Sequence, residues 1–114
     1  MTDSAEPASA PSSNPTRDIA QVPAVEVVTT VAVHLMSAAA VKCGLSDDAD
    51  AHDQIDLAEA RILITALAGL VNSSASLVGG SHAGPLRDGL SSLQAAFREA
   101  SSIPDAPGEG PGES

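Results

Sequence analysis

The longest apolar stretch of the chain, residues 22–45, constrains the fold more than any other feature. It reads VPAVEVVTTVAVHLMSAAAVKCGL. On a helix that advances by about 100° per residue, its polar stripe occupies roughly a quarter of the circumference. The residues of that stripe are Glu26, Thr30, His34 and Ser37. Most of the remaining surface is Val, Ala, Leu and Met, so the pattern predicts a helix that is covered on more than one side and around which the rest of the chain is organised.

A membrane span is the alternative interpretation of this stretch, because a helix of this length reaches across a bilayer at about 1.5 Å per residue. Glu26, His34 and Lys42 would then lie in or near the hydrocarbon, at a cost of roughly a few kcal/mol for each charged centre. The amino-terminal MTDSAEPASAPSS also lacks the basic segment and apolar run of a secretory signal. We therefore expect a cytoplasmic protein without a membrane span, and peripheral membrane association is a minor alternative.

Two further segments have the periodicity of amphipathic helices. The second expected helix covers residues 56–77, and Asp56 with Glu59 has the spacing of a capping box at its start. Its apolar stripe consists of Ala60, Leu63, Ile64, Leu67, Leu70 and Val71. The third covers residues 84–102, with Pro85 in its first turn. Its stripe consists of Leu86, Leu90, Leu93 and Phe97.

Glycine and proline define where these helices end. Gly44 supplies the left-handed stop of the first helix, over residues 22–44, and the Gly79–Gly80 pair ends the second. The connection at residues 46–54 is acidic, but it lacks the glycine and the terminal glutamate of a calcium loop, so we expect a solvated linker. The predicted fold class is all-α, with one three-helix domain over residues 18–103.

Both ends of the chain have the composition of disordered tails. Residues 1–17 and 104–114 are rich in Pro, Gly, Ser and acidic side chains, and they offer no apolar surface to offset the entropy of ordering. The domain between them is small, and with a single cysteine it has no disulfide. One Cys and three scattered His give no structural zinc site and no other metal site. We expect such a domain to gain burial by self-association.

The net charge of −10 argues against nucleic acid as a direct partner. The chain has 5 basic and 15 acidic residues, whereas phosphate binding needs clustered Lys and Arg. The expected partner is a second copy, with a dimer favoured. Two helices of the same chain can cover one stripe of the first helix but not the stripe beside it, and Thr65 and Gly69 form a groove of small residues on the second helix. The predicted self-association surface consists of Val27, Val31, Ala38, Val41, Thr65 and Gly69.

No residue is predicted to be catalytic, and no cofactor is expected. Glu26 and His34 are about 12 Å apart along one helix, too far to hydrogen-bond, so we expect His34 in the core or in an interface. Cys43 lies in the last helical turn, where the helix dipole raises a thiol pKa, and we expect it to be a small buried hydrophobe. The pair Ser81 and His82 is neither a phosphate loop nor a nucleophile elbow.

Three stretches and the carboxyl-terminal PDAPGEGPGE resemble the bacterial domain of unknown function 1844 (DUF1844). The stretches are DIAQVPAVEVVTTVAVHLMSAAAVKCGL, DLAEARILITALAGLV and HAGPLRDGLSSLQAAFREAS. The resemblance implies a small helical cytoplasmic protein of unknown biochemical function. Relatives have Thr-Gly-Asn-Leu before the third helix, where this chain has LVGGSHAGPL. Relatives are also encoded near genes for a translation initiation factor and ribosomal proteins, which implies an accessory factor of a translation-related protein as one alternative.

The function that we expect from the sequence is a non-enzymatic helical module for interaction and oligomerisation. The accessory factor bound to a translation-related protein is the first alternative. The second is a small-ligand-binding protein, or an enzyme, with a site between protomers.

Overall fold

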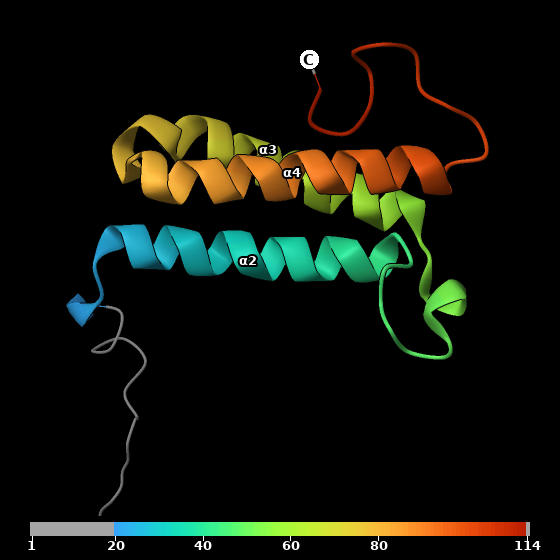
Figure 1. Ribbon diagram of the computed structural model, residues 1–114, viewed down its shortest axis with the longest axis horizontal. Coiled ribbons are helices and arrows are strands. Elements are labelled where there is room, and N and C mark those ends of the chain that lie inside the picture. Colours follow the sequence, from blue (N-terminus) through green and yellow to red (C-terminus); the bar gives the residue numbers. More distant parts are fainter. Residues whose placement is uncertain (1–19, 114) are drawn as a thin grey trace, which may run out of the picture.

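Three long helices form the protein in a computed structural model that describes residues 20–113 (Figure 1). Helix α2 covers Ala24–Lys42, α3 covers Leu57–Val78 and α4 covers Gly80–Ala100, and a short 3-10 helix, η2, covers Ala51–Gln54. Helix α3 runs antiparallel to both α2 and α4, and each of the three packs against the other two. The predicted all-α fold is confirmed. The expected tail at residues 1–17 lies outside the described residues.

The end of α2 is a Schellman motif, as the glycine predicted. The Leu45 amide donates to the Ala40 carbonyl at 2.9 Å, and the Gly44 amide donates to the Val41 carbonyl at 3.0 Å. Gly44 has φ of 84°, and a Cβ on it would lie 2.8 Å from Cγ1 of Ile55. Both the left-handed backbone and the packing therefore require glycine at this position.

The start of α3 realises one half of the predicted capping box. The Asp56 carboxylate accepts a hydrogen bond from the Glu59 amide at 3.2 Å. The Asp56 amide, which a full capping box would pair with the Glu59 side chain, donates instead to the Lys42 carbonyl at 2.9 Å. This bond ties the beginning of α3 directly to the end of α2.

The predicted start of the third helix at residue 84 is wrong. Helix α4 begins at Gly80, so Gly79 alone, with φ of 88°, separates it from α3. Pro85 consequently lies inside α4. A proline in the second turn removes the bond to the carbonyl four residues earlier, which belongs to the exposed Ser81. Water can solvate that carbonyl, so the helix tolerates Pro85.

Helices α3 and α4 supply eleven of the fourteen buried core residues, and this corrects the expectation that the first apolar run is the central helix. Helix α2 contributes only Ala32, Ala39 and the adjoining Cys43 to the buried set, while its Leu35, Met36 and Ala40 are partly buried and pack against that set. Helix α4 approaches α2 closely at Gly89, where a Cβ would lie 2.7 Å from Sδ of Met36. The buried hydrophobic residues of the core are Ala32, Ala39, Cys43, Ala60, Ile64, Leu67, Ala68, Val71, Ala75, Ala83, Leu86, Leu90, Leu93 and Phe97.

The carboxyl-terminal segment, residues 105–113, departs from the predicted disorder of residues 104–114. It turns back after α4 and passes over α3 and α4, on the side away from α2 (Figure 1). Its Asp105 carboxylate pairs with Arg61 of α3 at 2.8 Å, and its Pro111 is buried. The composition contains no large apolar anchor, and polar contacts with the two helices hold the segment in place.

Candidate functional site

The six residues predicted to form one self-association surface lie on two separate surfaces. Four are on α2, and two are on α3 beside the carboxyl-terminal segment, in a groove that contains no α2 residue. The α2 group consists of Val27, Val31, Ala38 and Val41; the α3 group consists of Thr65 and Gly69. Each surface is therefore a separate candidate for binding.

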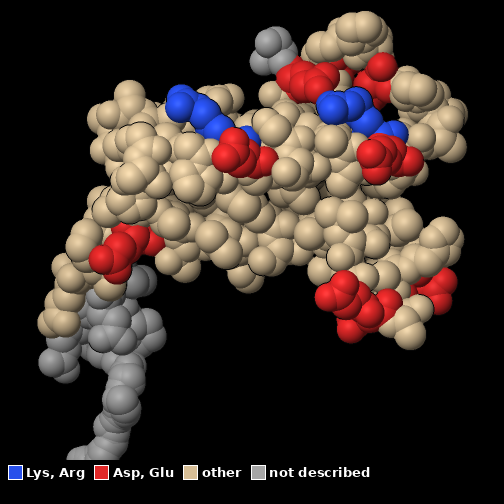
Figure 2. All heavy atoms as spheres, in the orientation of Figure 1, with Lys and Arg blue, Asp and Glu red and all other residues tan. Residues whose placement is uncertain are grey.

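The first candidate is the outward face of α2, which we call the valine face and define by Val27, Val31, Ala38 and Val41. The three valines are 39%, 46% and 37% exposed, and Ala38 is half-buried beside them. No charged residue occurs in the sequence between Glu26 and Lys42. Figure 2 shows, in this view, a broad band without charged side chains between the charged groups in the upper half of the molecule and the acidic groups at its lower left and lower right. The described chain thus leaves one of the two predicted apolar stripes of this helix uncovered.

His34 of α2 and Cys43, the residue after its end, lie in different environments. His34 is exposed within the valine face, so it is not a core histidine, and its place in an interface stays a prediction. Cys43 is a free, buried cysteine, and desolvation raises the pKa of its thiol. The prediction that Cys43 is a small buried residue at the end of this helix is confirmed.

Ser81 and His82 lie in the first turn of α4 rather than in a loop. Nδ1 of His82 is 3.1 Å from the Val78 carbonyl at the end of α3, and 3.5 Å from Oγ of Ser81. Both residues are exposed, and the ring serves to cap α3. Within residues 20–113, no group of three or more His, Cys, Asp or Glu side chains is placed to hold a metal ion.

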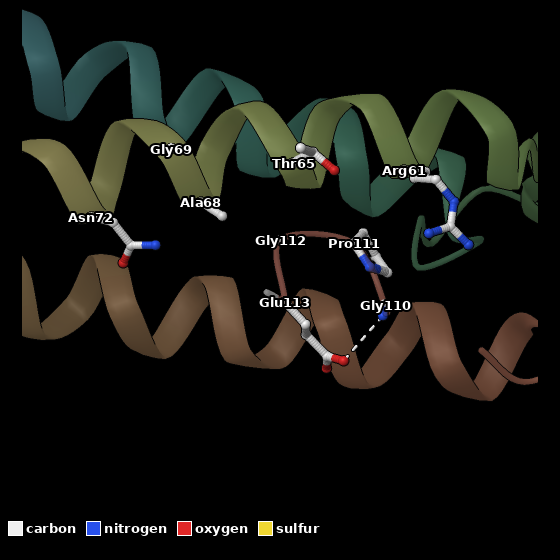
Figure 3. A pocket seen from close by; sticks show the side chains of 9 residues that line it. All are labelled: Arg61, Thr65, Ala68, Gly69, Asn72, Gly110, Pro111, Gly112 and Glu113. Carbon is white, nitrogen blue, oxygen red and sulfur yellow. Dashed lines mark hydrogen bonds between the residues drawn. The ribbon is translucent and has the colours of Figure 1, made fainter. Parts of the chain in front are cut away.

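The second candidate is an open groove of about 360 Å³ between α3 and the carboxyl-terminal segment, and sequence analysis did not predict that this segment forms one of its walls (Figure 3). Its floor is one side of α3, and its other wall is residues 110–113. The α3 residues that line it are Arg61, Thr65, Ala68, Gly69 and Asn72. The segment curls against itself here, since the Gly110 amide donates to Oε1 of Glu113 at 3.1 Å.

Arg61 is the main contact at one end of this groove. Its Nη2 lies 2.8 and 3.0 Å from the two carboxylate oxygens of Asp105, and its Nη1 donates to the Glu109 carbonyl at 3.4 Å. The guanidinium also lies 5.0 Å from the centre of the Phe97 ring. Arg61 therefore connects the apolar core to the segment through a cation–π contact and an ion pair.

The other end of the segment is held by α4. Nε2 of Gln94 donates to the Pro111 carbonyl at 3.0 Å, and Arg98 pairs with Glu113 at 3.2 Å. Between these contacts Gly112 passes so close to α3 that a Cβ on it would lie 2.7 Å from Cβ of Ala68.

The groove partly matches what the small residues of the second helix predicted. Another stretch of backbone does approach this side of α3, but it does so at Ala68, whereas a Cβ on Gly69 would meet nothing within 4 Å. One signal in the sequence is consistent with the contact. The segment has an acidic residue at every fourth position, Asp105, Glu109 and Glu113, and the chain has few basic residues to receive them.

Comparison with protein families places the chain. The model of a domain of unknown function, DUF1844, matches residues 24–99, which is more than half of the chain and includes nearly all of the three helices. The chain belongs to the DUF1844 family. The match includes the α3 residues that form the floor of the groove and stops before the carboxyl-terminal segment that forms its other wall. No curated protein and no solved structure matches this DUF1844 protein.

Two helices of the DUF1844 domain, α2 and α3, are long and apolar enough to cross a membrane by length and composition alone. A core helix of a soluble protein passes the same test, and α3 contributes six residues to the core. Only 11% of the corresponding stretch of α2 is buried, because the valine face of α2 is not covered by the described chain.

Proposed function

We propose that this DUF1844 protein is a cytoplasmic, non-enzymatic helical interaction module that forms a homodimer through the valine face of α2. The observation that carries the proposal is the row of exposed valines on a helix whose opposite face is packed in the fold. A contiguous apolar face of this kind is uncommon on a monomer that has no partner.

A second copy of the chain fits this face for two reasons. A symmetric dimer buries the same patch on both protomers, so one uncovered surface is sufficient. The middle of the face has no charge between Glu26 and Lys42, so two copies meet there without placing like charges opposite each other.

The size of the face predicts the strength of the dimer. Helix α2, Ala24–Lys42, presents a strip about 28 Å long at about 1.5 Å per residue and about 10 Å wide. This corresponds to roughly 280 Å² per protomer, about a third of the 800 Å² that a stable interface buries on each side. We therefore expect a weak dimer, with a dissociation constant in the micromolar range or above.

A membrane surface is the other occupant that the apolar face permits. The loop that follows α2 gathers acidic side chains at one end of the helix (Figure 2). They are Asp47, Asp48, Asp50, Asp53 and Asp56. An anionic lipid surface repels such a flank and a chain of net charge −10, which favours a second copy of the protein.

Sedimentation velocity at increasing concentration tests the dimer. The wild-type chain should change from monomer to dimer across about 10–1000 µM, and Val31→Asp should stay monomeric, because a carboxylate would be forced into the interface. Ile62→Asp is the matched control, since it adds the same charge at an exposed apolar residue of α3. Salt should strengthen the dimer by screening the net charge.

Two results would refute the proposal. One is a wild-type protein that stays monomeric across that range, and the other is a Val31→Asp variant that dimerises like the wild type. Flotation with vesicles of neutral and anionic lipid distinguishes the membrane alternative: wild-type protein that floats, and Val31→Asp protein that does not, would assign the valine face to a lipid surface.

A further inference from the structure

The carboxyl-terminal segment, residues 105–113, lies across α3 and α4 in the manner of a bound peptide and forms one wall of the open groove. We propose that the surface of α3 and α4 beneath this segment is a binding site for an acidic peptide rich in glycine and proline, which the chain's own residues 105–113 occupy in cis. The segment thereby masks the site from a partner peptide of the same chemistry. This proposal does not depend on the dimer, because the valine face lies on another helix.

Charge recognition in this site comes from two arginines. The Arg61 guanidinium donates to both carboxylate oxygens of Asp105, and the Arg98 guanidinium forms an ion pair with the Glu113 carboxylate. The Phe97 ring lies under the Arg61 guanidinium at 5.0 Å, and this contact orients the cation before a carboxylate arrives. The two ion pairs lie at opposite ends of the segment, so the site reads two acidic residues that are eight positions apart.

Backbone recognition in this site requires a glycine. Gly112 has φ of 76°, and a Cβ on it would lie 2.7 Å from Cβ of Ala68. At the neighbouring position, the Gln94 amide donates to the Pro111 carbonyl. A peptide is therefore accepted where it brings a glycine against Ala68 and a free carbonyl to Gln94.

The contacts of the segment are of a kind that a competitor can replace. The Arg61 and Asp105 side chains are 43% and 25% exposed, and the Arg98 and Glu113 side chains are 56% and 30% exposed. Partly exposed ion pairs contribute little to binding, because water and salt screen their charges. The segment binds in preference to a free peptide because it is covalently linked to α4, which gives it an effective concentration of about millimolar at the site. Open space beside Thr65, Gly69 and Asn72 is left for side chains that the glycine-rich segment lacks.

The test uses the full chain with its segment released by Asp105→Asn and Glu113→Gln. The probe is a fluorescently labelled peptide with the sequence of residues 104–114, and binding is followed by anisotropy. The released variant should bind it at least about tenfold more tightly than the wild-type chain, in which the segment competes in cis. Adding Arg61→Gln to the released variant should abolish this gain. Asp47→Asn with Asp53→Asn is the control: it removes the same charge outside the groove and should bind like the wild type.

Two further measurements check release and specificity. The NMR signal of the Gln94 side-chain amide should shift in the released variant, because the amide loses the Pro111 carbonyl. A probe with Gly112→Ala should bind more weakly than one with Gly108→Ala, since both glycines have positive φ but only Gly112 approaches α3. The proposal is overturned if the Gln94 signal does not move, if the released variant binds the probe no more tightly than the wild type, or if Arg61→Gln leaves binding unchanged.

Discussion

Replacing Phe97 with Ala should be among the most damaging single changes in this domain. Phe97 is the single aromatic residue of the chain and is 2% exposed. Truncating a buried Phe to Ala costs about 3–5 kcal/mol, because the cavity left behind closes only in part. Loss of the ring under Arg61 adds roughly 0.5–1 kcal/mol, the range for a partly exposed cation–π contact. A domain of this size is stable by about 5–14 kcal/mol, so the variant loses a large part of its stability.

Urea denaturation followed by far-UV circular dichroism measures this loss. The control is Leu77→Ala, which removes an apolar side chain from a residue that is 84% exposed and should cost less than about 0.5 kcal/mol. In a thermal scan followed by the same signal, we expect the melting temperature of Phe97→Ala to fall by about 12 °C or more, at about 4 °C or more per kcal/mol. If Phe97→Ala and Leu77→Ala lose similar stability, α4 does not pack through this stripe and the reasoning fails.

Two further predictions concern Gly44 and Cys43. Gly44→Ala should destabilise the protein in the same urea assay by about 1–2 kcal/mol, because φ is 84° and Ile55 occupies the space of a Cβ. Gly69 is a helical glycine with open space around it, so Gly69→Ala should instead stabilise the protein by about 0.5–1 kcal/mol. Equal effects of the two substitutions would contradict this prediction. Burial raises the pKa of the Cys43 thiol above its ordinary 9.0, so the folded state favours the protonated thiol. That contribution to stability is complete below the ordinary pKa and is lost as pH rises through the raised value, so urea midpoints should fall less steeply above pH 9 for Cys43→Ala than for the wild type.

The helices themselves follow from local sequence signals. The spacing of Leu86, Leu90, Leu93 and Phe97 identifies the buried face of α4, and all four are buried. Gly44 and Asp56 mark helix ends that the structure contains, because capping and left-handed stops depend on residues that are neighbours in the chain. The start of α4 was misplaced for a related reason. Proline is typical of a first turn, but one further helical turn before Pro85 costs little where the affected carbonyl is exposed.

The position of each helix in the bundle was harder to predict. Hydrophobicity made the first apolar run look central, yet α3 supplies six buried core residues and α2 only Ala32 and Ala39. Composition reports how apolar a helix is, whereas its neighbours decide which of its faces are covered. The split of the predicted interface has the same cause, since Val31 and Thr65 lie on different helices whose relative rotation no local pattern specifies.

Sequence alone determined the fold class, the number of helices, most of their ends, the buried stripe of α4 and the family. These properties arise from interactions over one to four residues, or from a pattern repeated along one helix. Tertiary structure decided that α2 has an uncovered face and that the carboxyl-terminal segment is bound. Arg61 and Asp105 are 44 residues apart in the sequence. Their side chains form an ion pair only because the packing of α3 and α4 brings them together. A composition that is too polar to form a core can therefore still be held against one.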